Sequence, residues 1–190
     1  MISLILNSIL LGVGLAMDAF SVSLANGLNE PGMKKPKMIG IASTFAGFQC
    51  LMPLLGYICV LTIAKIFVSF QTFIPYIALI LLAYIGIGMI VDGIKNKDVE
   101  KPGVGLKALL IQGIATSIDA LSVGFTISDY GYLEALTASV IIGIVTFAIC
   151  MIGLYLGKKF GTKLAGKASI LGGIILVCIG LEIFIKGVIL

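Results

Sequence analysis

Two aspartates lie deep inside long apolar stretches of the sequence, Asp18 in the first stretch and Asp119 in a later one. A charged aspartate at the centre of a membrane helix costs about 2.5 to 3.5 kcal/mol on insertion scales, so such residues are rare and usually functional. Two ionised carboxylates and one divalent cation sum to zero charge, whereas two bare carboxylates in a low dielectric repel each other and favour protonation. The pair therefore predicts cation binding. A hydrogen-bonded pair that only joins helices is the alternative.

Small and hydroxyl-bearing side chains share a helical face with each aspartate. Helical spacing places Ser21 beside Asp18, and it places Thr116 and Ser122 beside Asp119. Hydroxyl and main-chain oxygens on such faces are able to complete a cation site. Close packing of small residues is the alternative for each serine.

Gln49 adds an amide in the middle of another apolar stretch, four residues before Pro53. A kink at Pro53 is expected to free carbonyl oxygens for coordination, and an interhelical hydrogen bond of the amide is the alternative. Oxygen ligands of these kinds suit Mn²⁺, Mg²⁺ or Ca²⁺, whereas zinc and copper prefer histidine or thiolate. The expected metal site comprises Asp18, Asp119, Gln49, Ser21, Ser122 and Thr116.

Several kinds of chemistry are disfavoured by what the sequence lacks. There is no histidine, arginine or tryptophan, and the 13 basic residues are all lysines, in short clusters between apolar runs. This pattern disfavours nucleic-acid binding, and the lack of a phosphate-binding loop disfavours ATP hydrolysis. We therefore expect no enzymatic activity and no cofactor. The cysteines stand singly in apolar stretches and are expected to be reduced: Cys50, Cys59, Cys150 and Cys178.

Membrane helices are the elements that must position these residues. Of 190 residues, 59% are hydrophobic and 12% charged, and the mean hydropathy is +1.19. A single soluble core cannot bury that much apolar surface, so the lipid bilayer must be the solvent. Apolar stretches of about 20 residues, the length that spans a bilayer, are expected at 4–28, 38–61, 73–94, 107–128, 134–157 and 169–188. The predicted fold class is an all-α integral membrane protein of six transmembrane helices.

The two halves of the chain repeat each other. Residues 12–22 (GVGLAMDAFSV) align with 113–123 (GIATSIDALSV), an offset that relates the two aspartates (119 − 18 = 101). Ile85-Gly86 similarly aligns with Ile179-Gly180. Because each half has an odd number of spans, the second half must enter the membrane from the opposite side, as in transporters built from inverted repeats. We expect one membrane domain over 1–190, with a first three-helix repeat at 1–94, a cytoplasmic linker at 95–106 and a second repeat at 107–190.

Two further features are interpreted structurally. Gly153, Gly157 and Gly161 recur every four residues, a spacing typical of close helix packing. Asn26 lies near the cytoplasmic end of its span, where solvation at the membrane interface is the favoured interpretation and a role in cation entry or exit is the alternative.

Lysines predict the orientation of the spans. The first, third and fifth connections and the helix ends beside them carry eleven lysines, and the other side carries only Lys65 and Lys186. By the positive-inside rule the lysine-rich side is cytoplasmic, so both termini face outward. The eleven are Lys34, Lys35, Lys37, Lys95, Lys97, Lys101, Lys107, Lys158, Lys159, Lys163 and Lys167.

Five segments together resemble a known family, the bacterial manganese efflux pumps called MntP. They are residues 14–23 (GLAMDAFSVS), 48–56 (FQCLMPLLG), 89–93 (MIVDG), 115–124 (ATSIDALSVG) and 170–173 (ILGG). The resemblance runs the full length of the chain, and it matches Asp18 and Asp119 to the acidic positions inside the membrane of that family. The chain departs from the family pattern at Gln49, Gly88 and Asp92, where members often carry an acidic residue or histidine, arginine and glutamate, respectively.

The resemblance implies a secondary transporter in the bacterial plasma membrane that exports Mn²⁺ from the cytoplasm, with Mn²⁺ and protons as its small partners. From the residues alone, the choice among hard cations stays open. We expect export by proton exchange through the two aspartates, because protons are the natural replacement for the departing metal. A membrane scaffold or assembly protein that transports nothing, or an exporter of another small cation, is the alternative.

Overall fold

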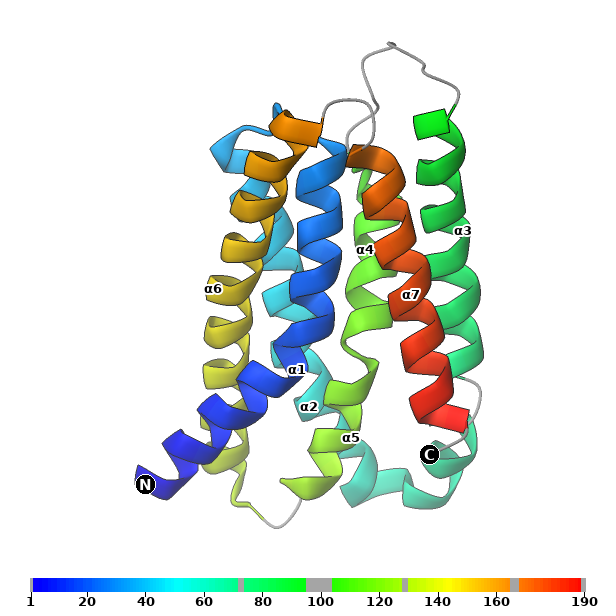
Figure 1. Ribbon diagram of the computed structural model, residues 1–190. Helices are drawn as coiled ribbons and strands as arrows, with labels where there is room; N and C mark the ends of the chain where they lie inside the picture. The colour runs from blue at the N-terminus through cyan, green and yellow to red at the C-terminus, as the bar shows by residue number, and fades with distance from the viewer. Residues whose placement is uncertain (1, 72–73, 95–103, 128–129, 165–167, 189–190) are drawn as a thin grey trace.

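The computed structural model describes residues 2–71, 74–94, 104–127, 130–164 and 168–188, and all regular structure in these residues is helical (Figure 1). The helices are α1 (Ile2–Asn29), α2 (Lys35–Gln71), α3 (Ile74–Ile94), α4 (Leu106–Thr116), α5 (Ile118–Thr126), α6 (Tyr132–Leu164) and α7 (Ala168–Val188). Each apolar segment expected from the sequence is therefore mainly helical where the structure describes it. The prediction of one continuous helix at 107–128 is wrong, because that segment is divided into α4 and α5.

Several of these helices are long and apolar enough to cross a bilayer. Within the described residues this holds for α1, for Lys35–Cys59 of α2 and for Tyr132–Gly161 of α6, and α4 with α5 passes the same test as a span bent by 41°. At 1.5 Å per residue, the 28 residues of α1 cover about 42 Å, more than the roughly 30 Å hydrocarbon core. Large apolar side chains such as Tyr84 and Leu133 are 80% and 74% exposed, as lipid contact requires. The chain is thus a multi-pass membrane protein.

The helices form one bundle in which neighbours in sequence are seldom neighbours in space. α1 packs mainly against α6 and α7, α2 against α5 and α6, and α3 against α7. The α1–α2 connection, the end of α6 and the start of α7 lie at one end of the bundle, where α4 also begins, and α1 begins and α7 ends at the other end (Figure 1).

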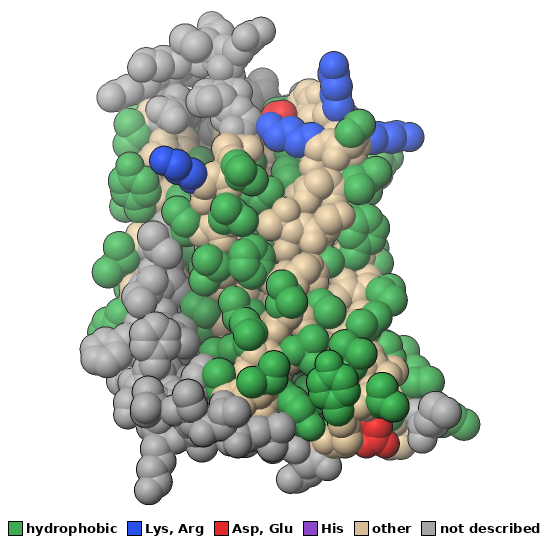
Figure 2. Space-filling model, turned by 180° about the vertical axis from the view of Figure 1, so that it is seen from behind, with side chains coloured by type: hydrophobic (Ala, Val, Ile, Leu, Met, Phe, Trp, Pro, Cys, Tyr) green, Lys and Arg blue, Asp and Glu red, His purple; other side chains and the backbone are tan. Residues whose placement is uncertain are grey.

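The first of these ends carries the basic charge, and we call it the lysine end. Lys37 pairs with Glu30 at 2.6 Å, and the Lys158 ammonium donates to the Met33 carbonyl at 2.7 Å, which joins α6 to the α1–α2 connection. On the face drawn in Figure 2, the blue side chains gather at this end. The side chains of Lys65, Lys95, Lys97, Lys101, Lys163, Lys167 and Lys186 lie outside the described residues.

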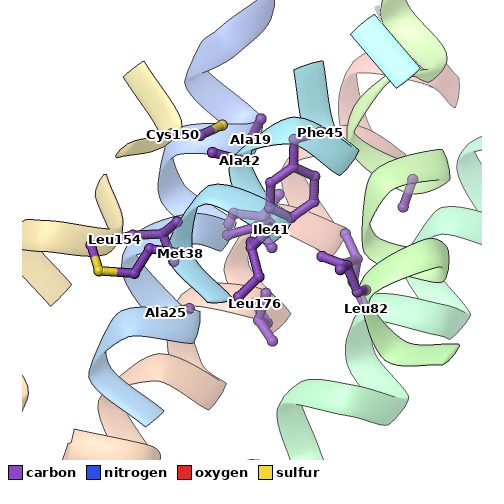
Figure 3. Packing of buried hydrophobic residues seen from close by; sticks show 14 of the residues in the cluster. Ala19, Ala25, Met38, Ile41, Ala42, Phe45, Leu82, Cys150, Leu154 and Leu176 are labelled. Carbon is purple, nitrogen blue, oxygen red and sulfur yellow. The ribbon is translucent and has the colours of Figure 1, made fainter. Parts of the chain in front are cut away.

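The largest apolar cluster lies toward the lysine end. Ala19 of α1, Phe45 of α2, Leu82 of α3, Leu154 of α6 and Leu176 of α7 all meet there (Figure 3). Two smaller clusters, centred on Ile142 and on Tyr57, occupy the opposite half of the bundle. The cluster of Figure 3 therefore joins helices from both halves of the sequence.

Glycines allow the closest helix contacts. A Cβ at Gly27 of α1 would lie 2.5 Å from the Leu154 carbonyl oxygen and 3.0 Å from the Gly157 Cα atom. A Cβ at Gly161 would lie 3.0 Å from the Leu28 carbonyl oxygen. The predicted role of the Gly153, Gly157 and Gly161 series in close packing is confirmed, and its partner is α1.

Candidate metal site

α1 passes through the centre of the bundle at the turn that precedes Asp18. Ala16 before Asp18 and Ala19 after it are fully buried, and Leu15 is 8% exposed. The Leu15 carbonyl accepts a hydrogen bond of 2.8 Å from the Gln49 side chain of α2. Asp18 itself is half-buried. The structure thus brings Gln49 to the turn that leads to the first aspartate.

Gln49 has acceptor capacity left over after this bond. The residue is 1% exposed, its Nε2 atom donates to Leu15, and its Oε1 atom has no hydrogen-bond partner within the described residues. α2 continues through Pro53, which has no N–H to donate to the main-chain carbonyl of Gln49. A buried carbonyl-type oxygen without a donor is costly in a protein interior and is the kind of group that a cation satisfies.

The second aspartate follows the break between α4 and α5. Ser117 ends α4 with φ −111° and ψ 6°, and its N–H bonds to the carbonyl of Ile114 instead of that of Gly113. The Ser117 hydroxyl donates a hydrogen bond of 2.6 Å to the Gly113 carbonyl instead. A side chain that competes in this way for a helix carbonyl destabilises and bends the helix. Discontinuous helices of this kind are typical of transporter sites near the bilayer midplane.

Asp119 stands in the first turn of α5 and is exposed. Its Oδ1 atom accepts a hydrogen bond of 2.8 Å from the Ala120 N–H, and the positive end of a helix favours its negative charge. Ser122, one turn later, is also exposed. The expectation that Thr116 shares one continuous helical face with Asp119 is wrong, because the break at Ser117 lies between them.

The other predicted hydroxyl ligands bond to their own helices. Ser21 donates to the Met17 carbonyl at 3.0 Å, and Thr116, 2% exposed, donates to the Gln112 carbonyl at 2.9 Å. Each hydroxyl proton is therefore used in a hydrogen bond within its own helix, while the hydroxyl oxygen keeps lone pairs that are able to bind a cation.

The turns around the two aspartates share an apolar cluster. Leu15 of α1 and Ala120 of α5 pack together with Ile142 of α6, and Met52 of α2 lies against them. The residues beside the aspartates on α1 and α5 therefore meet α2 and α6 in the same part of the bundle.

The structure corrects the interpretation of Asn26. Its side chain is 1% exposed, and it forms a reciprocal amide pair with Gln112 of α4, at 2.8 and 3.2 Å. Gln112 was not predicted to have a role. An amide side chain inside an apolar span is rare, and this feature of the sequence could have identified it. Thr146 of α6 was also missed. It is fully buried, and its hydroxyl has no hydrogen-bond partner within the described residues.

The described residues contain no group of three or more histidine, cysteine, aspartate or glutamate side chains arranged to hold a metal. A cation bound to the two aspartates would therefore take its remaining ligands from amide, hydroxyl or main-chain oxygens. This ligand set fits hard cations.

Known proteins resemble this chain over nearly its whole length. A family model described as "Putative manganese efflux pump" matches residues 32–184. A protein of Methanosphaera stadtmanae named "Putative manganese efflux pump MntP" is 40% identical over 181 residues, covering 95% of this chain and 98% of its own. Proteins with that name from Clostridium botulinum and Clostridium perfringens are 42% and 36% identical and cover 94% and 96% of this chain and 92% and 94% of their own. No solved structure matches. The chain belongs to the MntP family of manganese efflux pumps.

Proposed function

We propose that this protein is a six-span secondary transporter that exports Mn²⁺ from the cytoplasm in exchange for protons. Its site lies between two inverted three-helix repeats and contains Asp18 and Asp119, and both termini face outward. The observation that carries this proposal is a symmetry in the helix contacts, which gives the two aspartates equivalent places in the molecule.

The contacts of α3 with α7 support this symmetry. A Cβ at Gly86 would lie 2.7 Å from the Gly173 carbonyl oxygen and 3.2 Å from the Leu176 Cβ atom. A Cβ at Gly180 would lie 3.5 Å from the Leu79 Cα atom and 3.2 Å from the Leu82 Cβ atom. One offset of 94 relates all three positions (180 − 86, 173 − 79 and 176 − 82). Exchanging the two halves therefore reproduces the contact.

The aspartate-bearing helices follow the same rule. A Cβ at Gly153 of α6 meets Phe20 and Ser23 of α1, and a Cβ at Gly56 of α2 meets Leu121 and Gly124 of α5. An offset of 101 relates the α1 residues to those of α5 (121 − 20 and 124 − 23). An offset of 97 relates the glycine of α2 to that of α6 (153 − 56). The offset of 101 is also the one between Asp18 and Asp119.

The directions of the helices agree with an inverted repeat. α1 runs toward the lysine end, whereas α4 and α5 run away from it (Figure 1). Equivalent helices with opposite directions require an axis of pseudosymmetry in the membrane plane. On such an axis the equivalent aspartates approach the same central site from two sides.

The chemistry of this site favours a hard divalent cation. Asp18 and Asp119 balance its charge, and the unpaired Gln49 Oε1 atom is a neutral ligand beside the Asp18 turn. We include Ser21, Ser122 and Thr116 as oxygen ligands in this proposal. When the metal leaves, proton binding removes the repulsion between two carboxylates in a low dielectric, so the empty carrier returns in a neutral state.

Flux measurements in proteoliposomes test the proposal. Wild-type protein should move Mn²⁺ when a proton gradient is imposed, and Asp18→Asn combined with Asp119→Asn should reduce the rate at least tenfold, because a neutral site cannot balance the cation. Glu134→Gln is the matched control. This carboxylate is exposed in the first turn of α6, where its Oε2 atom accepts the Gly131 N–H, and its replacement should leave flux unchanged.

Two outcomes would contradict the proposal in different ways. Flux that persists in the double variant would exclude the aspartates as the site. Flux that is unaffected when the proton gradient is collapsed at constant membrane potential would exclude proton exchange and leave a uniporter or channel.

A further inference from the structure

Thr146 carries one of two buried hydroxyls that lack a hydrogen-bond partner in the described residues, the other being that of Ser23. Thr146 is fully buried in α6, and its Oγ1 atom has no hydrogen-bond partner within the described residues. Six other hydroxyls within helices donate to the carbonyl four residues earlier, and so does that of Ser117 just after α4. The six belong to Ser8, Ser21, Thr44, Thr116, Thr137 and Ser139. Thr146 leaves this available bond unused, although a buried hydroxyl without a partner is costly.

The register of α1 against α6 places this hydroxyl next to the Asp18 turn. Gly12 contacts Ile142 and Gly27 contacts Gly157, both with an offset of 130 (142 − 12 and 157 − 27). The same offset places Thr146 opposite Ala16, since 146 − 16 = 130. The adjacent residue, Leu15, is the one that accepts the Gln49 amide. Thr146 and Gln49 therefore approach the same turn of α1 from α6 and α2.

Thr146 and Gln49 are also equivalent in the proposed pseudosymmetry. The offset that relates Gly56 of α2 to Gly153 of α6 is 97, and 146 − 49 is also 97. Their side-chain oxygens are two of the three buried side-chain polar atoms without a partner in the described part of the chain. The third is Ser23 Oγ of α1, which lies near the thiol of Cys150 in α6.

We propose that the Thr146 hydroxyl oxygen is a ligand of the transported cation. It is the counterpart, in the second half of the chain, of the Gln49 amide oxygen in the first half. This inference rests on the proposed function. The site then has two carboxylates and two neutral oxygens, each pair related by the same pseudosymmetry. A neutral hydroxyl adds a ligand for a hard cation without disturbing the charge balance of the aspartates.

Thr146→Val tests this role, because valine keeps the shape of threonine and lacks the hydroxyl. The full-length protein is purified in detergent, Mn²⁺ is titrated by calorimetry, and thermal unfolding is followed without metal. We expect the dissociation constant to rise about tenfold or more, the usual consequence of losing a contact to a charged group. The unfolding temperature should stay equal or rise, because no unpaired hydroxyl remains buried.

Two further variants separate the hydroxyl from its surroundings. Thr146→Ser keeps the hydroxyl and should bind Mn²⁺ with an affinity close to that of the wild type. Ser139→Ala removes a fully buried hydroxyl of the same helix that already donates to the Ala135 carbonyl at 2.9 Å. It should leave Mn²⁺ affinity unchanged.

Each contrary result has a distinct meaning. Wild-type affinity in Thr146→Val, or equal weakening in Thr146→Ser, would overturn this inference and leave the proposed function standing. A lower unfolding temperature in Thr146→Val than in Ser139→Ala would assign the hydroxyl a structural partner, which also overturns it. Absence of Mn²⁺ binding by the wild-type protein would overturn the proposed function and this inference together.

Discussion

The amide pair of Asn26 and Gln112 links the two halves of the chain inside the lysine end of the bundle. Both residues are 1% exposed, and each amide donates to and accepts from the other. In a low dielectric such a matched pair is stabilising, while one amide alone is costly. The pair therefore ties α1 to α4 specifically.

Replacing one amide should destabilise the protein more than replacing both. Asn26→Leu leaves Gln112 buried without a partner, so we expect a loss of about 1 to 3 kcal/mol in the free energy of unfolding. Asn26→Leu combined with Gln112→Leu should recover much of this loss. Denaturant unfolding in detergent of both single variants and the double variant gives the coupling energy. Additive losses would show that the two amides act independently.

The residues of the proposed site were predictable from the sequence to different degrees. Asp18, Asp119 and Gln49 stand out because charged and amide groups are rare in apolar spans. The solvation predicted for Asn26 was wrong, because its partner Gln112 is 86 positions away and no local pattern connects them. Thr146 gave no signal at all, since a threonine in a span normally bonds to its own helix.

Among the helices, the break between α4 and α5 is the feature that the sequence did not predict. The sequence predicted one span here because its hydropathy is continuous across Ser117. At the break, the Ser117 N–H bonds to the Ile114 carbonyl, and the Ser117 hydroxyl donates to the Gly113 carbonyl in place of a main-chain N–H. Hydropathy does not register such competition for carbonyls, so helix existence was predictable while helix continuity was not.

Glycine in α2 offers a test of close helix packing. A Cβ at Gly56 would overlap the Leu121 carbonyl oxygen of α5 and lie 3.0 Å from the Gly124 Cα atom. Gly56→Ala should therefore cost about 1 to 3 kcal/mol, the range seen for overpacking, and should lower the thermal unfolding temperature in detergent. Gly47→Ala in the same helix is the control, because no atom lies within 4 Å of its added Cβ. Equal stability of the two variants would contradict the α2–α5 contact.

At the scale of the whole molecule, the two halves interleave. α1 packs on α6 and α7, and α2 packs on α5 and α6, whereas consecutive helices contact each other little. The largest cluster draws on both halves, with Phe45 and Leu82 from the first and Leu154 and Leu176 from the second. A single membrane domain over residues 1–190 stays our prediction.

Composition and repeat spacing predicted the helical membrane class and the positions of the helices. They did not predict which helices pair, because a membrane helix is apolar on most of its surface and its hydropathy marks no face for a partner. The glycine positions specify the partners, and they do so only once the two surfaces are brought together, as for Gly27 and Gly157.

The lysine end predicts the orientation of the protein. Lys37 pairs with Glu30, and Lys158 donates to Met33, so the α1–α2 connection and the end of α6 lie on one side of the membrane. Because lysine-rich short connections are retained in the cytoplasm, this side should be cytoplasmic. Tyr132, which begins α6 at the opposite end and is 65% exposed, should then face outward.

Single cysteines and a membrane-impermeant maleimide measure this orientation. The background is a variant in which the native cysteines, Cys50, Cys59, Cys150 and Cys178, are replaced. In intact cells the reagent should label Tyr132→Cys and should not label Lys35→Cys or Lys159→Cys, whereas all three should react after permeabilisation. Labelling of both lysine positions from outside would contradict the predicted orientation, although the direction of the proposed exchange would still be set by the ion gradients. Labelling of only one would contradict the bundle itself, because the hydrogen bond from Lys158 to Met33 requires α6 and the α1–α2 connection to end on the same side.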